Sequence, residues 1–490
     1  MRDIYEAVYR SQPEEHASAA LSISGAVPAD LKGTFLRNGP GLMQLGDDAY
    51  LNFLDGHALI VGVTFADGRA RFRSRYVRTP LYAAETAQHT VLARRPFTNR
   101  PQRWTNLFAL KFGNSVMHDV YAWGDGEQRR VVAGNDFGHF ALDPRTLATL
   151  GPETWSGAAP EGKSEMGPMP YPDPHTGRLI AWLKQPGGLK PDALAFVEID
   201  AAFRVAKRTP FWPLAAAPAI VHDQRASAGW YIATEQALRL KPAQAIWGAS
   251  TAYDALVTPP GGTATLLLAS RSDPTALIRV PLPAPIQVAF HILNAFDQGA
   301  HVVVDLVTYG GRVGFEAAAP RPLRERTGHA PSDGPLPTPV RFVVDPARGQ
   351  VVETRKLSDL PGEAPEVADS VMGKPYRYAY VPTSNGADLP DRGAYFYFGA
   401  LAKLDVESGA SEVWNAGSDA LVSPCAFVQR PAAASEDDGW LLAYVLREPS
   451  TQVVILDARA LTRGPVATLD LGVHLPGTSH VRWAPDVALD

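Results

Sequence analysis

The chain has 490 residues, of which 46% are apolar and 20% are charged, so it can bury a substantial core. Its net charge of −5 gives no reason to expect nucleic acid or an anionic membrane surface as a partner. Cys425 is the single cysteine, which excludes an intramolecular disulfide, a thiolate metal site and an iron–sulfur cluster.

The first residues, MRDIYEAVYR, predict a short helix over 3–10 and contain no apolar signal core. A second short helical piece is expected around 243–256. No run approaches the ~18 consecutive apolar residues that a membrane span needs. These features favour a cytoplasmic protein, with peripheral membrane contact left open through surface loops around 80–110 or 236–268. The sequence does not constrain the oligomeric state.

Most of the remaining chain is typical of short strands separated by turns. The 42 glycines and 43 prolines together make up about 17% of the 490 residues. In an average protein these two residue types make up roughly 12%. A recurring unit is an apolar strand followed by aspartate and a turn, as at Asp143, Asp173, Asp200, Asp345, Asp405 and Asp457. Each aspartate can start its turn by accepting a downstream backbone N–H. Repeated hairpin units of this kind predict an all-β fold, a β-propeller, with a large sandwich or two β domains as alternatives.

No segment has the composition of a linker, so we expect a single domain over 1–490. The Pro-rich stretch 321–339 is interpreted as a surface excursion between strands, and 431–440 as a hairpin tip.

Three histidines lie far apart in short, apolar, strand-like segments: His222 in APAIVHDQ, His291 in VAFHILNAFD and His480 in LPGTSHVRW. A lone histidine near a strand is usually a hydrogen-bonded structural residue. In a propeller, however, the inner strand of each blade directs side chains at one axis, so distant histidines can converge. An all-imidazole site suits Fe(II), Zn or Cu.

The dipeptide His118-Asp119 looks like a catalytic dyad, but adjacent residues on a strand point to opposite faces. We therefore interpret His118 as a solvated edge residue. By the same reasoning, Asp223 is not expected to bind a metal held by His222.

The segments GTFLRNGPG (33–41), FLDGHALI (53–60) and FADGRARFRSRYVRT (65–79), with the three histidine segments, resemble the carotenoid cleavage oxygenase family. The resemblance runs from about residue 20 to the C-terminus. This family includes carotenoid-, apocarotenoid- and stilbene-cleaving enzymes and the retinoid isomerase of the eye. The resemblance implies a seven-bladed β-propeller with a loop and short-helix cap over an axial non-haem iron site.

Within that resemblance, His222, His291 and His480 match three of the four metal ligands. The fourth ligand position falls on Met169 in GPMPYPDP, so one corner of the site is altered. Thioether sulfur is a poor partner for Fe(II), and Met169 is expected to line the pocket.

The family also places glutamates behind its ligand histidines. Glu363 matches one of them and would hold His291. Asn135 occupies the second position, where its amide oxygen can accept a bond from His222, unless the register slips by one to Asp136. Pro424 occupies the third and offers no side-chain acceptor. Stilbene-cleaving relatives carry a Lys beside the second position, where this chain has Gly134, which puts a phenolate-directed route in doubt.

Two interpretations stay open. In the first, the three histidines hold Fe(2+), and the iron is the catalytic group of a dioxygenase that cleaves a C=C bond of an apocarotenoid, another polyene or an aryl-alkene with O2. No separate acid or base is assigned. In the second, oxygen chemistry is lost. The chain is then a metal-free or differently metallated isomerase, hydratase or lyase, or a non-catalytic binder of an apolar ligand.

Overall fold

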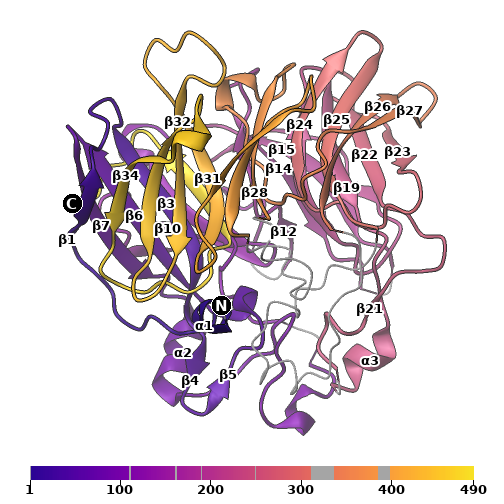
Figure 1. Cartoon of the computed structure of the whole chain (residues 1–490). Helices are drawn as coiled ribbons and strands as arrows, with labels where there is room; N and C mark the ends of the chain where they lie inside the picture. Colours follow the sequence, from indigo (N-terminus) through magenta and orange to yellow (C-terminus); the bar gives the residue numbers. More distant parts are fainter. Residues whose placement is uncertain are drawn as a thin grey trace.

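In the part of the chain that the structure describes, seven antiparallel sheets of three or more strands stand around a central axis, as Figure 1 shows from the side. The computed structural model describes residues 2–109, 112–160, 163–188, 190–248, 250–310, 336–384 and 398–490. The inner strands of neighbouring sheets touch, including β35 with β8, β18 with β24, and β31 with β35. The predicted seven-bladed propeller is confirmed, and the sandwich is not what the chain forms.

We number the blades 1 to 7 around the axis and give their strands from the inside outwards. Blade 1 contains β35 (His480–Ala484), β3 (Gly33–Leu42), β6 (His57–Ala66), β7 (Arg69–Tyr76) and β1 (Ala19–Ala20). Blade 2 contains β8 (Asp119–Trp123), β9 (Arg130–Asn135), β10 (Gly138–Leu142) and β11 (Thr149–Glu153). Blade 3 contains β12 (Glu165–Met166), β13 (Tyr171–Pro172), β14 (Leu179–Gln185), β15 (Ala193–Ile199), β16 (Val205–Arg208) and β17 (Trp212–Pro213).

The other four blades follow in chain order. Blade 4 contains β18 (Val221–Ala226), β19 (Trp230–Glu235), β22 (Thr265–Ser270) and β23 (Leu277–Pro281). Blade 5 contains β24 (Ile292–Gln298), β25 (His301–Thr308), β26 (Thr338–Asp345) and β27 (Gln350–Lys356). Blade 6 contains β28 (Tyr378–Thr383), β29 (Ala400–Asp405) and β30 (Ser411–Asn415). Blade 7 contains β31 (Leu421–Gln429), β32 (Gly439–Leu446), β33 (Gln452–Asp457), β34 (Pro465–Asp470) and β2 (Ser22–Gly25).

Both ends of the chain close the ring. In blade 1 the C-terminal strand β35 pairs with the N-terminal strand β3, and in blade 7 strand β2 pairs with β34. Pairing of this kind ties the two ends of the chain together and closes the ring of blades.

The aspartate turns form as the sequence predicts. All six predicted aspartates accept a backbone N–H two or three residues downstream, at donor–acceptor distances of 3.0–3.2 Å: Asp143, Asp173, Asp200, Asp345, Asp405 and Asp457. Residues 430–438 connect β31 to β32, so most of the hairpin tip expected at 431–440 lies in this connection. The stretch 321–339 lies almost entirely outside the described residues.

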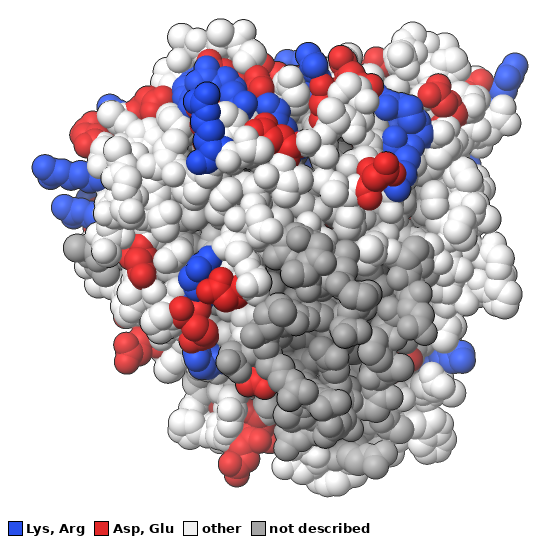
Figure 2. All heavy atoms as spheres, in the orientation of Figure 1, with Lys and Arg blue, Asp and Glu red and all other residues white. Residues whose placement is uncertain are grey.

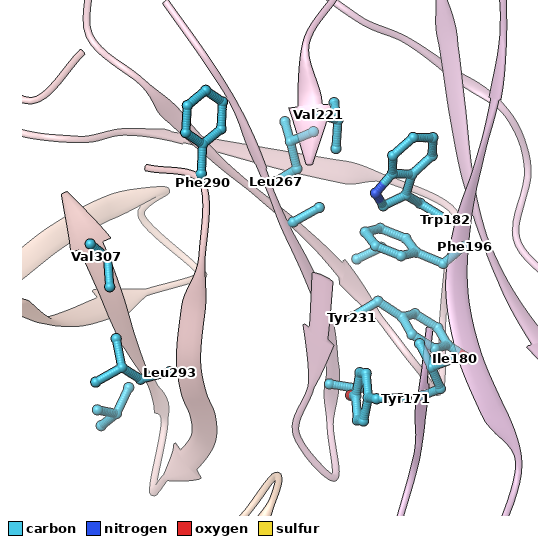
Figure 3. Packing of buried hydrophobic residues seen from close by; sticks show 14 of the residues in the cluster. Tyr171, Ile180, Trp182, Phe196, Val221, Tyr231, Leu267, Phe290, Leu293 and Val307 are labelled. Atoms are coloured by element: carbon cyan, nitrogen blue, oxygen red, sulfur yellow. The ribbon is translucent and has the colours of Figure 1, made fainter. Parts of the chain in front are cut away.

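The hydrophobic core is divided among the interfaces between blades. One large cluster joins blades 3, 4 and 5, and Figure 3 shows part of it, with Trp182 and Phe196 packed beside Tyr231. The same cluster continues to Leu293 and Phe290, which flank His291 in the sequence. Rigid packing therefore reaches the strands that carry the axial histidines.

Short helices and loops gather at one end of the propeller, the lower end in Figure 1. They are α1 (Arg2–Ala7), α2 (Pro80–Gln88), α3 (Pro242–Ile246) and the strand pairs β4 (Gln44–Leu45)–β5 (Asp48–Ala49) and β20 (Arg239–Leu240)–β21 (Leu256–Val257). Single-turn 3-10 helices occupy Phe53–Asp55, Arg103–Asn106, Gly126–Gln128, Asp369–Val371 and Leu461–Arg463. The expected helices at 3–10 and 243–256 are therefore present but shorter. The organisation of 1–490 as one domain stays a prediction.

Among the described residues, no helix is both long and apolar enough to cross a membrane. On the described part of the face in Figure 2, acidic and basic side chains are interspersed, and neither sign gathers into a continuous patch.

A buried carboxylate ties the cap to blade 1 and makes the structure sensitive to acid. Glu85 of α2 accepts hydrogen bonds from the Tyr50 hydroxyl, His57 and Arg95, at 2.8, 2.8 and 3.0 Å, and from the Leu92 backbone N–H. Burial alone would raise the Glu85 pKa, but the bond from His57 and the charge of Arg95 outweigh burial and lower the pKa to about 2.

We expect Glu85 to contribute stability that is fully present above its ordinary pKa of about 4.5 and is lost as the pH falls towards 2. The contribution is of the order of 2–3 kcal/mol. Chemical denaturation between pH 2.5 and 5.5 measures it, and Glu85→Gln should remove that part of the acid dependence. An unchanged acid dependence in the variant would show that other carboxylates control it.

Candidate metal centre

Four imidazoles meet on the axis of the propeller. His480 is the first residue of β35, His118 directly precedes β8, His222 lies in β18, and His291 directly precedes β24. Ring centroids are 4.6 Å apart for His118 and His480, and 4.8 Å apart for His118 and His222. They are 5.2 Å apart for His222 and His291, and 5.3 Å apart for His291 and His480. The inner edges of blades 1, 2, 4 and 5 thus supply one closed ring of four.

Irregular pairing at the ends of inner strands helps to aim these rings. The register between β18 and β19 shifts between Val221 and Gln224, so His222 lies within a bulge. The register between β24 and β25 shifts between Ile292 and Asn294, next to His291. Bulges bend a strand and redirect its side chains, and they are common beside active sites.

The spacing fits a single ion. With metal–nitrogen bonds of about 2.1 Å, two imidazoles on one ion have ring centroids about 4.6 Å apart at a right angle and about 5.3 Å apart at the tetrahedral angle. The four observed separations span 4.6–5.3 Å. One nitrogen each of His118, His222 and His480 also lies within 4.8 Å of the others, and among the described residues His291 joins the ring by its centroid distances to His222 and His480 but not by this nitrogen spacing. An all-imidazole donor set suits Fe(II), Zn or Cu, so these residues fit the metal that the sequence predicts.

The protonation states agree with metal binding for most of the ring. Burial, with smaller contributions from the neighbouring imidazoles, lowers the pKa of His118 to about 3 and the pKa of His222 and His480 well below the ordinary value. For His291, burial also acts to lower the pKa, but the negative charge of Glu363 outweighs it and raises the pKa. Neutral imidazoles are the form that binds metal ions.

Three positions, Glu363, Asn135 and Pro424, match the glutamates that stand behind the ligand histidines in the family. Of these, Glu363 bonds one of the four axial histidines. Its carboxylate is in hydrogen-bond contact with Nδ1 of His291, and it also accepts from the Tyr309 hydroxyl and the Ala364 backbone N–H. A carboxylate behind a ligand histidine fixes the tautomer and the ring orientation. This contact makes Nε2 the nitrogen of His291 that faces away from Glu363.

The other outer positions do not support a histidine. Asn135 Oδ1 accepts the Phe137 backbone N–H at 3.0 Å instead of bonding His222, because Asn135 starts the β9–β10 turn. Asp136 is half-buried in that turn, and burial raises its pKa to about 7. Pro424 lies in a bulge of β31, where its carbonyl accepts the Ser423 hydroxyl.

Met169 lies between β12 and β13, on blade 3, and is 3% exposed. Its backbone carbonyl accepts a hydrogen bond from Nε2 of Gln224 at 2.6 Å, which fixes this segment beside β18 of blade 4. The altered ligand position is therefore buried between the blades that carry His118 and His222.

The interpretation of His118 as a solvated edge residue is wrong. Its half-buried ring lies against the rings of His222 and His480 at the axis. The prediction that His118 and Asp119 do not form a dyad is correct, since Asp119 instead accepts a hydrogen bond from Arg482 at 3.1 Å. The error was to place the face of the strand that carries His118 in solvent. One signal in the sequence could have found His118, because VMHDV repeats the His-Asp dipeptide of IVHDQ at His222.

Comparison with known proteins extends over nearly the whole chain. The family model described as retinal pigment epithelial membrane protein (RPE65) matches residues 9–485. The chain is 28% identical to the apocarotenoid-15,15'-oxygenase of Synechocystis sp., over 97% of this chain and 95% of that protein. It is 27% identical to the isoeugenol monooxygenase of Pseudomonas putida, over 94% of each. A solved structure of a Synechocystis apocarotenoid oxygenase variant matches it with a TM-score of 0.87 and 26% identity over 99% of both chains. A propeller matched along its length, with histidines converging on its axis, places this chain in the RPE65 family of carotenoid cleavage oxygenases.

Proposed function

We propose that this chain is an oxygenase that uses O2 to cleave a C=C bond of an apolar conjugated substrate. The reaction gives two carbonyl products, and as a dioxygenase it places one atom of O2 in each of them. We propose His222, His291 and His480 as holders of Fe(II), which would supply O2 chemistry and a positive charge that stabilises developing oxyanions. No side chain is assigned as a separate acid or base.

One observation carries this proposal, namely the convergence of imidazoles from different blades on the axis of a propeller that resembles oxygenases along its length. Glu363 orients His291 through Nδ1. Phe290 contacts the His222 ring edge-on, with centroids 5.3 Å apart, and is 8% exposed. An imidazole site with an aromatic wall suits an apolar substrate.

Gly134 supports an apocarotenoid or another apolar polyene over a phenolic stilbene. A Cβ added at Gly134 would lie 1.8 Å from Cδ2 of His139, so a lysine fits there only if His139 moves. His139 is 2% exposed and packs edge-on against Trp155, with centroids 5.8 Å apart, which holds it in place. The space that a phenolate-binding lysine would need at position 134 is therefore filled by the packed ring of His139.

The test is O2-dependent cleavage by tag-free protein loaded anaerobically with Fe(II) and then desalted. Candidate substrates are an apocarotenal, isoeugenol and a hydroxystilbene, followed with an oxygen electrode and by mass spectrometry under 18O2. We expect one O2 consumed per substrate cleaved, label in both carbonyl fragments, and the apocarotenal as the preferred substrate. Metal-free protein and His480→Ala serve as controls and should be inactive.

Two results would overturn the proposal. An isomerised or hydrated product without O2 uptake would assign the chain to repurposed, non-oxidative chemistry. Tight binding of the apocarotenal with no change to it, at full iron loading, would assign it to ligand binding.

A further inference from the structure

We infer that His118 is a fourth metal-binding side chain, supplied by blade 2 in place of the ligand position that Met169 occupies on blade 3. This inference rests on the proposed function, because it concerns the same metal. It adds a residue from a blade that the three-histidine assignment leaves without a ligand.

The ring of four imidazoles is closed only by His118. The three-histidine set contains two ring contacts, of His291 with His222 and with His480, at 5.2 and 5.3 Å. His118 bridges His222 and His480 on the opposite side, and its two contacts, 4.8 and 4.6 Å, are the shortest in the ring. A point at the centre of the ring is therefore surrounded from four directions, with His118 facing His291 across it.

His118 also shares with His222 the pattern of contacts made by the aspartate that follows it. Each is followed by an aspartate, and in each pair the aspartate Oδ1 accepts the next backbone N–H at 2.8 Å. Each aspartate is also paired with an arginine, Asp119 with Arg482 at 3.1 Å and Asp223 with Arg225 at 2.7 Å. The first strand of blade 2 thus presents His118 to the axis in the way that the first strand of blade 4 presents His222.

The His118 ring has a nitrogen atom that makes no hydrogen bond within the described residues and could bind a metal ion. Across the parts of the chain that the structure describes, the buried Nδ1 of His118 has no hydrogen-bond partner. Asp119 does not orient the ring, because its oxygens are engaged by Val120 N–H and Arg482. A buried polar atom without a partner is rare and calls for an explanation such as a bound ion. A ligand histidine held by packing against His222 and His480 accounts for it.

Among its described residues, blade 3 contributes no imidazole to the ring of histidines. Met169 is buried there, and thioether sulfur is a soft donor that suits Cu(I) better than Fe(II). Moving the fourth ligand to the preceding blade keeps four neutral nitrogen donors and leaves Met169 as an apolar wall. The ion is then held from blades 1, 2, 4 and 5.

The experiment compares metal retention in the full chain with that in His118→Ala, Met169→Ala and His291→Ala. Each protein is loaded anaerobically with Fe(II) or Co(II), desalted and assayed by elemental analysis, and the Co(II) absorption spectrum reports the ligand set. We expect His118→Ala to weaken metal affinity by more than about tenfold, the lower bound for losing even an outer partner of a ligand. We expect its Co(II) spectrum to change, whereas Met169→Ala keeps both the affinity and the spectrum of the unmodified chain.

Thermal unfolding of the metal-free proteins shows whether each variant folds, and His118→Gln provides a second variant of similar volume. Unchanged affinity and spectrum in His118→Ala and His118→Gln, with metal lost in His291→Ala, would overturn this inference and leave the proposed function standing. Loss of metal from Met169→Ala but not from His118→Ala would also overturn it. An unmodified chain that retains neither metal would overturn the inference and the iron-dependent function together.

Discussion

Replacement of Arg271 by methionine is expected to destabilise the protein by about 3–5 kcal/mol, because it takes the counter-charge from buried Asp173 and one of two contacting arginines from buried Glu198. Arg271 follows β22 of blade 4, is 8% exposed, and donates to Asp173 at 2.7 Å and to Glu198 at 2.9 Å. Both acceptors belong to blade 3, and their side chains are 0% and 2% exposed. Equilibrium or kinetic unfolding in guanidinium chloride measures the loss.

Arg204→Met is the matched control, since it removes the same side chain from an exposed pair. Arg204 contacts Asp200 at 2.9 Å, but its side chain is 73% exposed. Such surface pairs contribute roughly 0–1 kcal/mol. Equal effects of the two substitutions would contradict the view that the buried charge cluster holds blades 3 and 4 together. A much larger effect of Arg271→Met would support it.

The turns of this fold could be predicted because their cause is local. Asp143 and Asp405, for example, accept backbone N–H groups two and three residues away, so the sequence around each aspartate contains the whole interaction. The closure of the ring could not be predicted in the same way. Strand β35 pairs with β3, bringing His480 opposite Asn38, and no local pattern encodes a contact across that separation.

The site was predictable only as far as resemblance reached. His222, His291 and Glu363 were placed by matching motifs, and the structure brings the two histidines together and sets Glu363 behind His291. Asn135 shows the limit of matching positions, because its oxygen is used by its own turn at Phe137. That outcome was available from the sequence, since Asn followed by Asp-Phe-Gly is a typical turn.

His118 was misjudged for a different physical reason. The alternation of side chains along a strand separates His118 from Asp119, but alternation does not tell which face is outside. In this propeller the inner strands surround the axis and touch those of neighbouring blades, so a side chain that leaves one inner strand can meet the axis or another blade. Asp119 reaches Arg482 of blade 1, and His118 reaches the axis. Only the closed ring of blades decides between the two.

Replacement of His291 by alanine is expected to remove bound iron and C=C cleavage together. His291 is the ring histidine that contacts a carboxylate, and Glu363 is in turn held by the Tyr309 hydroxyl and the Ala364 backbone N–H. Glu363→Gln keeps the size of that partner but removes its charge. We expect Glu363→Gln to weaken iron affinity roughly 10–100-fold and His291→Ala to weaken it further. Competition with a chelator of known affinity measures both.

Comparing the loss of iron affinity in Glu363→Gln with that in His291→Ala shows whether His291 binds the metal or only pairs with Glu363 to stabilise the fold. Glu363 is 1% exposed, so His291→Ala also leaves a buried carboxylate with fewer partners and should lower stability. The double variant His291→Ala/Glu363→Gln removes that charge and should recover stability without recovering iron. If the double variant regains iron, or if Glu363→Gln loses as much iron as His291→Ala, then folding rather than ligation explains the losses. Stability that recovers while iron does not would assign His291 to the metal and Glu363 to its orientation.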